Sequence, residues 1–483
     1  MSTNYAQRWG EFVSATSFAE LPGDVTHRMK RSLLDMLGCA VIGSRSESSD
    51  ALGHYLTQAG GTPEATLLPS GRRTSSFQAA LANGTHVHAP ELAESFTRAT
   101  MHCGNAVPPA ALAEVEKQHG SGQALLVAMA VGYEIAIRTG LSVRAEPPGP
   151  TFAAKDENRP SGPLGPRYIS HPVSTFGLYG AAAAAASALG LDPARAAQAM
   201  VLSTSLTPTI GRGTAYWEGA MAKDIFQGLS NAIGVMSAEL AAVGVTGGDD
   251  VTAHLGSLVS DYEPTWLDHR LGEEWLISSG GLHFKLHMTS GMTQPAADAI
   301  LDALRKRPFD PHEVDKIDAW VPERGLRQSA VQQPPTMVAS TISIPYVLST
   351  IIAFYDDVRA DPYFTELYRA DRFDDPRRRA LADKIFVHGS DRFSHGFEQE
   401  WPMTFESRVE VRLTSGEIVT GEAEIWSVSA NLSDSAVEDK FRDVAGRVLS
   451  KDRIERAIHE VFRIDEAENL DSLLAAVCGN RQA

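Results

Sequence analysis

Residues 122–138 read GQALLVAMAVGYEIAIR, and this stretch decides the fold class. Apolar side chains occupy nearly every face of the helix that it would form, which is typical of a helix buried inside a bundle. Residues 181–186 are consecutive alanines, and residues 229–243 are again rich in alanine and other small residues. Alanine has the best helix propensity, and small side chains allow neighbouring helices to approach closely. We therefore predict a bundle of buried helices in the first half of the chain.

The second half shows strand patterns and then returns to helix. Alternating apolar and polar residues predict strands at 314–321, 407–413 and 418–424, and the last two form a hairpin with Gly416 in its turn. Helical periodicity resumes at about residue 435 and continues towards the end of the chain. The predicted fold class is mainly α, with a large all-helical domain and a smaller inserted α+β lid domain.

The predicted domain boundaries follow from this change of pattern. The chain has 483 residues, which exceeds what one hydrophobic core usually supports. We assign residues 1–278 and 430–483 to the helical domain and residues 279–429 to the lid. The segment 146–166 is rich in proline and glycine, so we expect no regular structure there. A long loop inside a helical core is a candidate lid or substrate-facing element.

Composition and charge argue against several kinds of partner. The 43 basic and 60 acidic side chains give a formal charge of −17, which repels nucleic acid and anionic lipid. The N-terminus has no signal-peptide core, and we expect no membrane-spanning segment. Cys39, Cys103 and Cys478 lie far apart, so neither a disulfide framework nor an iron–sulfur cluster is expected. We predict a cytoplasmic protein that binds neither nucleic acid nor membrane.

Histidines and carboxylates gather in one stretch of the first half. A metal site is one interpretation, because these side chains are common metal ligands. Two of the histidines are two residues apart, which suits a strand, whereas on a helix they would point well apart. The competing interpretation is a set of ordinary polar residues where a helix meets a loop. The residues concerned are His86, His88, Glu91, Glu94 and His102.

Three further positions carry groups that suit a carboxylate ligand. His171 precedes a predicted helix that begins with Ser174 and Thr175, and the free N–H groups of a helix N-terminus can hold an anion. Lys223 leads into the second small-residue helix, and Lys285 lies at the junction of the two domains. A lysine ammonium is a point charge that suits a carboxylate. Most lysines are nevertheless solvated surface residues, and serine or threonine often only caps a helix.

The sequence lacks the common nucleophile and cofactor motifs. It contains no G-x-S-x-G, Walker A or H-E-x-x-H motif, and no G-x-G-x-x-G that follows a strand. Acid–base chemistry without a cofactor or a metal is therefore the most economical enzymatic interpretation.

Short segments with a fixed order and spacing extend along nearly the full chain. They are LLDMLG at 33–38, NGTHVHA at 83–89, HCGNAVPP at 102–109, GYE at 132–134, HPVSTFG at 171–177, MAK at 221–223, KL at 285–286 and SIPY at 343–346. In this order they resemble the MmgE/PrpD family, which includes 2-methylcitrate dehydratase, cis-aconitate decarboxylase and iminodisuccinate epimerase. Each segment is short, so their order and spacing carry the resemblance.

The resemblance implies a fold, a partner and a site. The family fold is an all-helical domain with a smaller α+β lid, and the active site lies between these two domains. Members of the family are usually homodimers. This chain departs from the family pattern in three places. It has ELAE at 91–94 where the family has the acidic motif DFDD, it has Thr289-Ser290 where the family often has a cysteine pair, and its loop 146–166 is long. The residues implied in the site are Glu91, His102, His171, Lys223, Lys285 and Tyr346.

Such a site would move protons on a small di- or tricarboxylate. Lys223, Lys285 and the helix N-terminus with Ser174 and Thr175 would hold the substrate carboxylates and stabilise the negative charge that develops beside them. Imidazole titrates near neutral pH, so His102 or His171 would act as general acid or base. Glu91 would orient a histidine or bind a substrate hydroxyl, and Tyr346 would complete the catalytic set.

Several functions are compatible with these residues. The first is a cofactor-independent lyase that dehydrates or decarboxylates a polycarboxylate. The second is a cofactor-free epimerase, in which two groups on opposite faces exchange one proton. The third is a binding protein on a retired enzyme scaffold, suggested by Ala93 in the acidic motif, and the fourth is a metal hydrolase built on His86 and His88.

Overall fold

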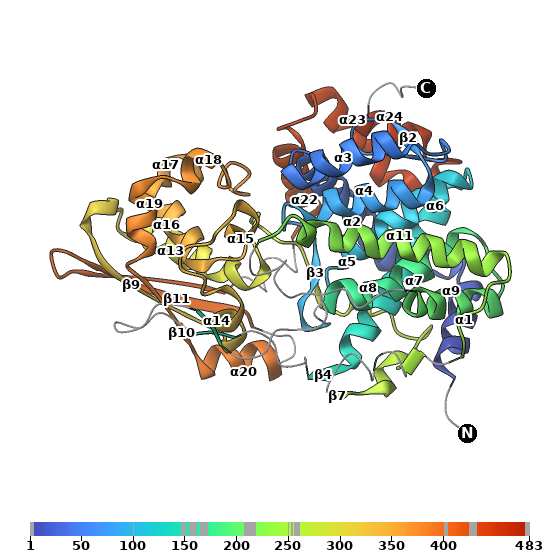
Figure 1. Cartoon of the computed structure of the whole chain (residues 1–483), viewed down its shortest axis with the longest axis horizontal. Coiled ribbons are helices and arrows are strands. Elements are labelled where there is room, and N and C mark those ends of the chain that lie inside the picture. The colour runs from blue at the N-terminus through green and yellow to red at the C-terminus, as the bar shows by residue number, and fades with distance from the viewer. Residues whose placement is uncertain are drawn as a thin grey trace.

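The computed structural model confirms a mainly α fold with a smaller α+β region (Figure 1). Two hydrophobic cores organise it. The larger is built from residues between Ala6 and Phe284 together with residues between Val437 and Cys478, and the smaller from residues between Ala296 and Val419. The larger core includes Phe284, so it extends past the predicted boundary between residues 278 and 279. The residues described are 4–99, 101–145, 151–153, 162–164, 172–206, 219–249, 251–252, 255, 261–399, 404–424 and 432–478.

The larger core is surrounded by helices from both ends of the chain. Its N-terminal helices are α1 (Tyr5–Ala15), α2 (Gly23–Gly43), α3 (Glu47–Ala59), α4 (Ser76–His88), α5 (Cys103–Ala106), α6 (Pro108–Lys117), α7 (Gly122–Ser142), α8 (Pro172–Ala188), α9 (Pro193–Ser205) and α11 (Ala222–Ala242). The returning C-terminal helices are α22 (Asp434–Ala445), α23 (Lys451–Phe462) and α24 (Asp471–Cys478). Because α22 packs directly on α2, the two ends of the chain share one core.

Close backbone contacts fix how the central helices cross. Gly84 of α4 faces Gly228 of α11, where a Cβ on Gly228 would lie 2.1 Å from the Leu81 carbonyl oxygen. Gly132 of α7 and Gly180 of α8 meet in the same way. A Cβ on either glycine would lie 2.7 Å from the carbonyl oxygen of the other. Atoms cannot approach so closely, so glycine is required at these crossings. The first crossing sets the distance between the end of α4 and the start of α11.

Helix α7 is long and apolar enough to cross a bilayer by length and composition alone. Within the structure, however, 89% of its most apolar window is buried. Its charged residues Glu134 and Arg138 pair with each other inside the core. The burial is what a central bundle helix would show, as the sequence predicts.

The smaller core lies between a four-stranded sheet and its covering helices. The sheet has the order β10-β9-β11-β12, with β9 and β10 parallel and the other pairs antiparallel. In Figure 1, α13 and α16 lie on one side of this sheet and α20 on the other. The strands are β9 (Val314–Val321), β10 (Ile385–Gly389), β11 (Glu406–Leu413) and β12 (Ile418–Glu424). The helices are α13 (Gln294–Lys306), α14 (Glu323–Ser329), α15 (Met337–Ser340), α16 (Ile344–Ala353), α17 (Tyr355–Arg359), α18 (Ala370–Phe373), α19 (Pro376–Ala382) and α20 (Asp391–Gln399).

The strands predicted from alternation are confirmed. The hairpin turns at Gly416, whose φ of 88° is the left-handed conformation that glycine adopts without strain. The expectation for 146–166 is wrong in part, because β5 (Thr151–Ala153) pairs with β6 (Gly162–Leu164) in a small antiparallel hairpin. Proline at 163 is tolerated there because a two-stranded ribbon leaves one edge of each strand unpaired.

The remaining short strands also form two-stranded ribbons. They are β1 (Ala65–Thr66) with β2 (Arg73–Thr74), β3 (Ser95–Phe96) with β8 (Leu282–His283), and β4 (Val143–Ala145) with β7 (Asp261–Tyr262). The pairing of β3 with β8 matters most for the site, because it brings the loop after α4 to the segment that precedes the smaller core.

Candidate active site

Glu91 is the centre of the candidate site. It lies in the loop between α4 and β3, where its φ of 53° is in the left-handed region. For a residue with a side chain this conformation costs about 1–2 kcal/mol, so the surroundings must hold it in place. The carboxylate is buried, with 4% of the side chain exposed.

Two lysines share this one carboxylate. Lys223, in the first turn of α11, places its Nζ 2.6 Å from Oε1 of Glu91. Lys285, two residues after β8, places its Nζ 3.0 Å from Oε2 of Glu91. Both lysine side chains are fully buried. The three groups come from segments far apart in the sequence, and only the packing of α4, α11 and β8 brings them together.

The charges of the three groups are strongly coupled. Burial alone would raise the pKa of Glu91, but the ammonium groups of Lys223 and Lys285 outweigh it and hold that pKa well below its usual range. Burial lowers the pKa of Lys285, and Glu91 opposes this. A lysine ammonium has three donors, and Glu91 is the hydrogen-bond acceptor recorded for Lys285 among the described residues. Lys285 can therefore donate to a second carboxylate.

His102 lies beside these charges, at the start of α5. Its Nδ1 is hydrogen-bonded to the hydroxyl of Ser95, which leaves Nε2 for another partner. Burial and the nearby Lys285 ammonium lower the pKa of His102 well below its usual value. The imidazole is therefore neutral at physiological pH and can act as a base. We call Glu91, Lys223, Lys285 and His102 the active-site cluster.

Two more histidines surround His102. The ring of His88, at the end of α4, lies with its centroid 6.4 Å from that of His102, and its Nδ1 is 2.7 Å from the amide nitrogen of Asn105. His283 lies opposite Ser95 in the ribbon of β3 and β8. Burial, followed by the charge of Lys285, lowers the pKa of His283 to about 3. The His283 ring is therefore neutral near physiological pH and adds no positive charge to the site.

A second buried charged group, the anchoring cluster of Arg28, Asp35, Glu94 and Lys440, holds the loop that carries Glu91. Lys440 of α22 donates to Asp35 at 2.6 Å and to the carbonyl of Leu92 at 3.0 Å. The backbone N–H of Glu94 donates to Asp35 at 3.0 Å, and Arg28 donates to the Glu94 carboxylate at 2.8 Å. Glu94 therefore stabilises the loop, and of the two acidic residues in ELAE only Glu91 faces the lysines.

Tyr346, the tyrosine predicted to be in the site, and Tyr368 lie next to each other in the lid. Tyr346 lies inside the smaller core, where its hydroxyl donates to the Leu367 carbonyl at 3.4 Å and the guanidinium of Arg378 lies 4.9 Å from its ring centroid. Burial raises the pKa of Tyr346 to about 12. Tyr368 stacks on it, with centroids 5.9 Å apart, and burial and the charge of Glu91 both raise the pKa of Tyr368. No contact between Tyr346 and the active-site cluster is recorded for the described residues.

Some predicted site residues cannot be compared with the structure. His171 lies outside the described residues, and so do the side chains of Ser174 and Thr175. For the metal interpretation, His86 and His88 lie on the helix α4, where residues two apart point in different directions. Among the described residues, no group of three or more His, Cys, Asp or Glu side chains is arranged to hold a metal ion.

Three contributors had no signal in the sequence. Ser95 supports His102, Asp224 lies 3.5 Å from the Lys223 Nζ, and Lys440 holds the loop at Leu92. Each is an ordinary polar residue in its own segment, and its role depends on a partner far away in the chain. Of the local patterns in the sequence, only the gathering of His88 and His102 in one short stretch pointed to the region of the active-site cluster.

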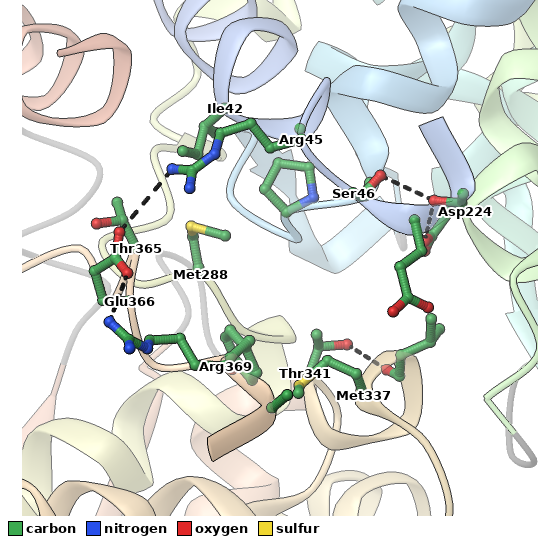
Figure 2. Close-up of a pocket in the computed structure, with 18 residues that line it drawn as sticks. Ile42, Arg45, Ser46, Asp224, Met288, Met337, Thr341, Thr365, Glu366 and Arg369 are labelled. Carbon is green, nitrogen blue, oxygen red and sulfur yellow. Dashed lines mark hydrogen bonds and ion pairs between the residues drawn. The ribbon is translucent and has the colours of Figure 1, made fainter. Parts of the chain in front are cut away.

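A cavity of about 350 Å³ lies between the two cores (Figure 2). On the helical side it is lined by Arg45, Pro90 and Asp224, and on the other side by Tyr368 and Arg369. Its walls therefore include the sequence neighbours of Glu91 and Lys223. Figure 2 shows Arg45 and Arg369 directed towards one carboxylate, that of Glu366.

Comparison with known proteins identifies the family. The MmgE/PrpD N-terminal domain matches residues 7–257, and the MmgE/PrpD C-terminal domain matches residues 287–464. The chain belongs to the MmgE/PrpD family. This confirms the family assignment made from the eight short segments, and the protein is an enzyme of MmgE/PrpD type, a lyase.

Similar proteins cover nearly the whole MmgE/PrpD chain. The cis-aconitate decarboxylase-like protein oryM of Aspergillus oryzae is 24% identical, over 95% of this chain and 94% of its own. The human cis-aconitate decarboxylase is 24% identical, over 99% of this chain and 95% of its own. The cis-aconitate decarboxylase of Aspergillus terreus is 22% identical, over 94% of this chain and 92% of its own.

Proposed function

We propose that this MmgE/PrpD protein is a cofactor-independent lyase that removes CO₂ from a small unsaturated tricarboxylate. The observation that carries the proposal is the pair of buried lysines that share one carboxylate beside a neutral imidazole. The relatives named cis-aconitate decarboxylase support both the substrate class and the reaction. The active-site cluster is the proposed place of the chemistry.

Substrate binding uses the charges of the two lysines. Lys285 has donors to spare, and a substrate carboxylate would bind between it and Lys223. Inside a site that excludes water, these fixed cations stabilise an anion far better than they would in solution. The N-terminus of α8, with Ser174, Thr175 and His171, would hold a further carboxylate.

The chemistry requires one bond to break and one proton to move. When CO₂ leaves, the electron pair of the broken C–C bond moves onto the carbons conjugated with a remaining carboxylate. The lysines stabilise the charge that develops there. A bound polyanion raises the pKa of the neighbouring His102, which can then take up a proton and deliver it to the carbon.

A second reaction is favoured by the state of His102 in the free enzyme. Its pKa is held well below the usual value, so the imidazole is neutral and suited to remove a proton next to a carboxylate. Dehydration of a hydroxy tricarboxylate, or epimerisation, would begin with that step. Glu91 would then bind the substrate hydroxyl or keep the lysines in place.

The test is to detect products from cis-aconitate, citrate and 2-methylcitrate by mass spectrometry, with solvent deuterium as tracer. Loss of CO₂ supports the first proposal, loss of water the second, and deuterium uptake without either loss indicates epimerisation. We expect His102→Asn to lower kcat about 10²- to 10⁴-fold, the usual contribution of a general acid or base. An active wild type with unchanged rates in His102→Asn and Lys223→Ala would refute the proposed site.

The pH dependence separates the two roles of His102. A base must be neutral, so kcat/KM would stay level through pH 6.5 and fall only below it, where the lowered pKa lies. A proton donor would show the opposite slope, with the rate falling as pH rises. We also propose that the enzyme is cytoplasmic and that it forms a homodimer; sedimentation of the purified protein would test the homodimer.

A further inference from the structure

Tyr368 lies in the lining of the cavity between the two cores, near enough to Glu91 for that carboxylate to affect its pKa. It belongs to the connection between α17 and α18, and it lines the cavity together with Pro90 and Asp224. Its ring stacks on that of Tyr346, with the planes only 10° apart. Stacking against a residue of the smaller core fixes the orientation of the ring and the position of its hydroxyl.

The hydroxyl of Tyr368 has no hydrogen-bond partner in the structure among the described residues, although it is buried. The Thr289 hydroxyl donates to the Thr341 carbonyl at 2.7 Å and lies near enough to lower the pKa of Tyr368, but it does not meet the geometry of a hydrogen bond with the Tyr368 hydroxyl. Leaving a buried donor without an acceptor costs stability, so native proteins seldom do it without a reason. A ligand that brings an acceptor would remove this cost.

The electrostatics around Tyr368 keep its proton in place. Burial raises the pKa of Tyr368 well above its usual value, Thr289 lowers it, and the carboxylate of Glu91 raises it further. The hydroxyl therefore stays protonated near neutral pH, and it lies close enough to Glu91 to be affected by its charge. It is available as a donor and not as a base.

We propose that Tyr368 is a substrate-binding residue whose hydroxyl donates a hydrogen bond to a carboxylate of the di- or tricarboxylate held by Lys223 and Lys285. This rests on the proposed function, which supplies the polycarboxylate. A hydrogen bond from a hydroxyl to a carboxylate is stronger than one between neutral groups. The adjoining cavity, about 350 Å³ in volume, has the size of a small-molecule site, and Tyr368 is one of the residues that line it.

The experiment compares three tyrosine-to-phenylalanine variants of the full-length protein, each of which lacks one hydroxyl group. Tyr368→Phe removes the proposed donor, and Tyr346→Phe removes the hydroxyl of its stacking partner, which the sequence favoured. Tyr363→Phe is the matched control, because Tyr363 lies in the same connection and does not line the cavity. The readouts are the melting temperature without ligand, its increase with citrate, and kcat and KM with the best substrate.

For Tyr368→Phe we expect an unchanged or higher melting temperature without ligand, because the buried donor without a partner is gone. We expect the stabilisation by citrate to shrink and kcat/KM to fall about 10- to 100-fold, the usual range for a hydrogen bond to a charged group. Tyr363→Phe should match the wild type in every readout. That pattern supports the proposal, and a larger loss in Tyr346→Phe than in Tyr368→Phe overturns it.

A fourth variant separates this proposal from the one on which it rests. Lys285→Met should abolish the stabilisation by citrate. If it does so while Tyr368→Phe retains the full citrate response and full kcat/KM, the role of Tyr368 is wrong and the proposed site stands. If Lys285→Met binds citrate as the wild type does, both proposals are overturned.

Discussion

Two lysines that are almost equally buried, Lys285 and Lys440, lie at opposite sides of the same loop. The side chain of Lys440 is 3% exposed and that of Lys285 is 1% exposed. Lys440 contacts the carboxylate of Asp35 and the carbonyl of Leu92, and its Nζ lies 5.9 Å from the centroid of the Phe284 ring. Lys285 shares the single carboxylate of Glu91 with Lys223.

The difference shows how a structural and a functional buried charge can be told apart. Lys440 has two acceptors within the fold and lies near the Phe284 ring, so the fold alone holds it. Among the described residues Lys285 has one acceptor, Glu91, and a second cation lies on the same carboxylate. A buried cation that its own fold leaves incompletely paired is prepared for an anion from outside. Burial alone would have placed both lysines in one class.

The largest effect on stability is expected at the anchoring cluster. Lys440→Met leaves Asp35 buried without its cation, which lowers the free energy of unfolding by about 3–5 kcal/mol. Urea denaturation followed by circular dichroism measures this. Lys451→Met, at an exposed lysine of α23, is the control and should have no measurable effect. A loss below about 1 kcal/mol in Lys440→Met, the range of surface ion pairs, would contradict the structural role.

The active-site cluster should show the reverse pattern. Lys285→Met removes a preorganised cation, so we expect kcat/KM to fall about 10²- to 10³-fold. The free energy of unfolding should change by less than about 1 kcal/mol, because Glu91 keeps Lys223 and the repulsion between the lysines disappears. Steady-state kinetics and urea denaturation of the same preparation give both numbers. If Lys285→Met were strongly destabilised but kept normal activity per folded molecule, Lys285 would have the same structural role as Lys440, and the comparison would be wrong.

The crossing of α4 and α11 should couple stability to activity. In Gly228→Ala the new Cβ would lie 2.1 Å from the Leu81 carbonyl oxygen, so the helices must separate. Overpacking of this kind costs about 1–3 kcal/mol, and it moves Lys223 away from Glu91. We expect a lower melting temperature and a lower kcat. Gly53→Ala on α3, where nothing lies within 4 Å of the new Cβ, is the control and should be neutral or stabilising.

The smallest effect is expected at His86, a buried histidine outside the active-site cluster. Burial lowers its pKa from 6.5 to about 4, so between these values the unfolded chain binds a proton that the folded protein does not. Its contribution to stability is complete above pH 6.5 and is lost as pH falls towards 4. His86→Gln should reduce the loss of stability between pH 6.5 and 5.5 by about 1 kcal/mol. Equal pH profiles for wild type and variant would contradict this.

The fold could be predicted further than the site could. The stretches 122–138 and 314–321 identify their elements by themselves. A helix buried on all sides is apolar throughout, whereas a strand buried on one side alternates apolar and polar residues. The pairing of Glu91 with the two lysines was available only through the family resemblance. Tyr346 and Tyr368 show the limit: Tyr346 lies in the first turn of α16 and Tyr368 lies just before α18, and no local pattern says which of them lies near Glu91.

The sequence by itself determined that the protein is a helical bundle with an α+β insertion, that it belongs to the MmgE/PrpD family, and which lysines and histidines to consider. These properties follow from periodicity, composition and motif order, which are local. Only the tertiary structure decided that Glu91 binds two cations, that Glu94 and Lys440 anchor its loop, and that Tyr368 lies nearer to the site than Tyr346. Those facts depend on distances between segments up to several hundred residues apart, which packing fixes and no single segment encodes.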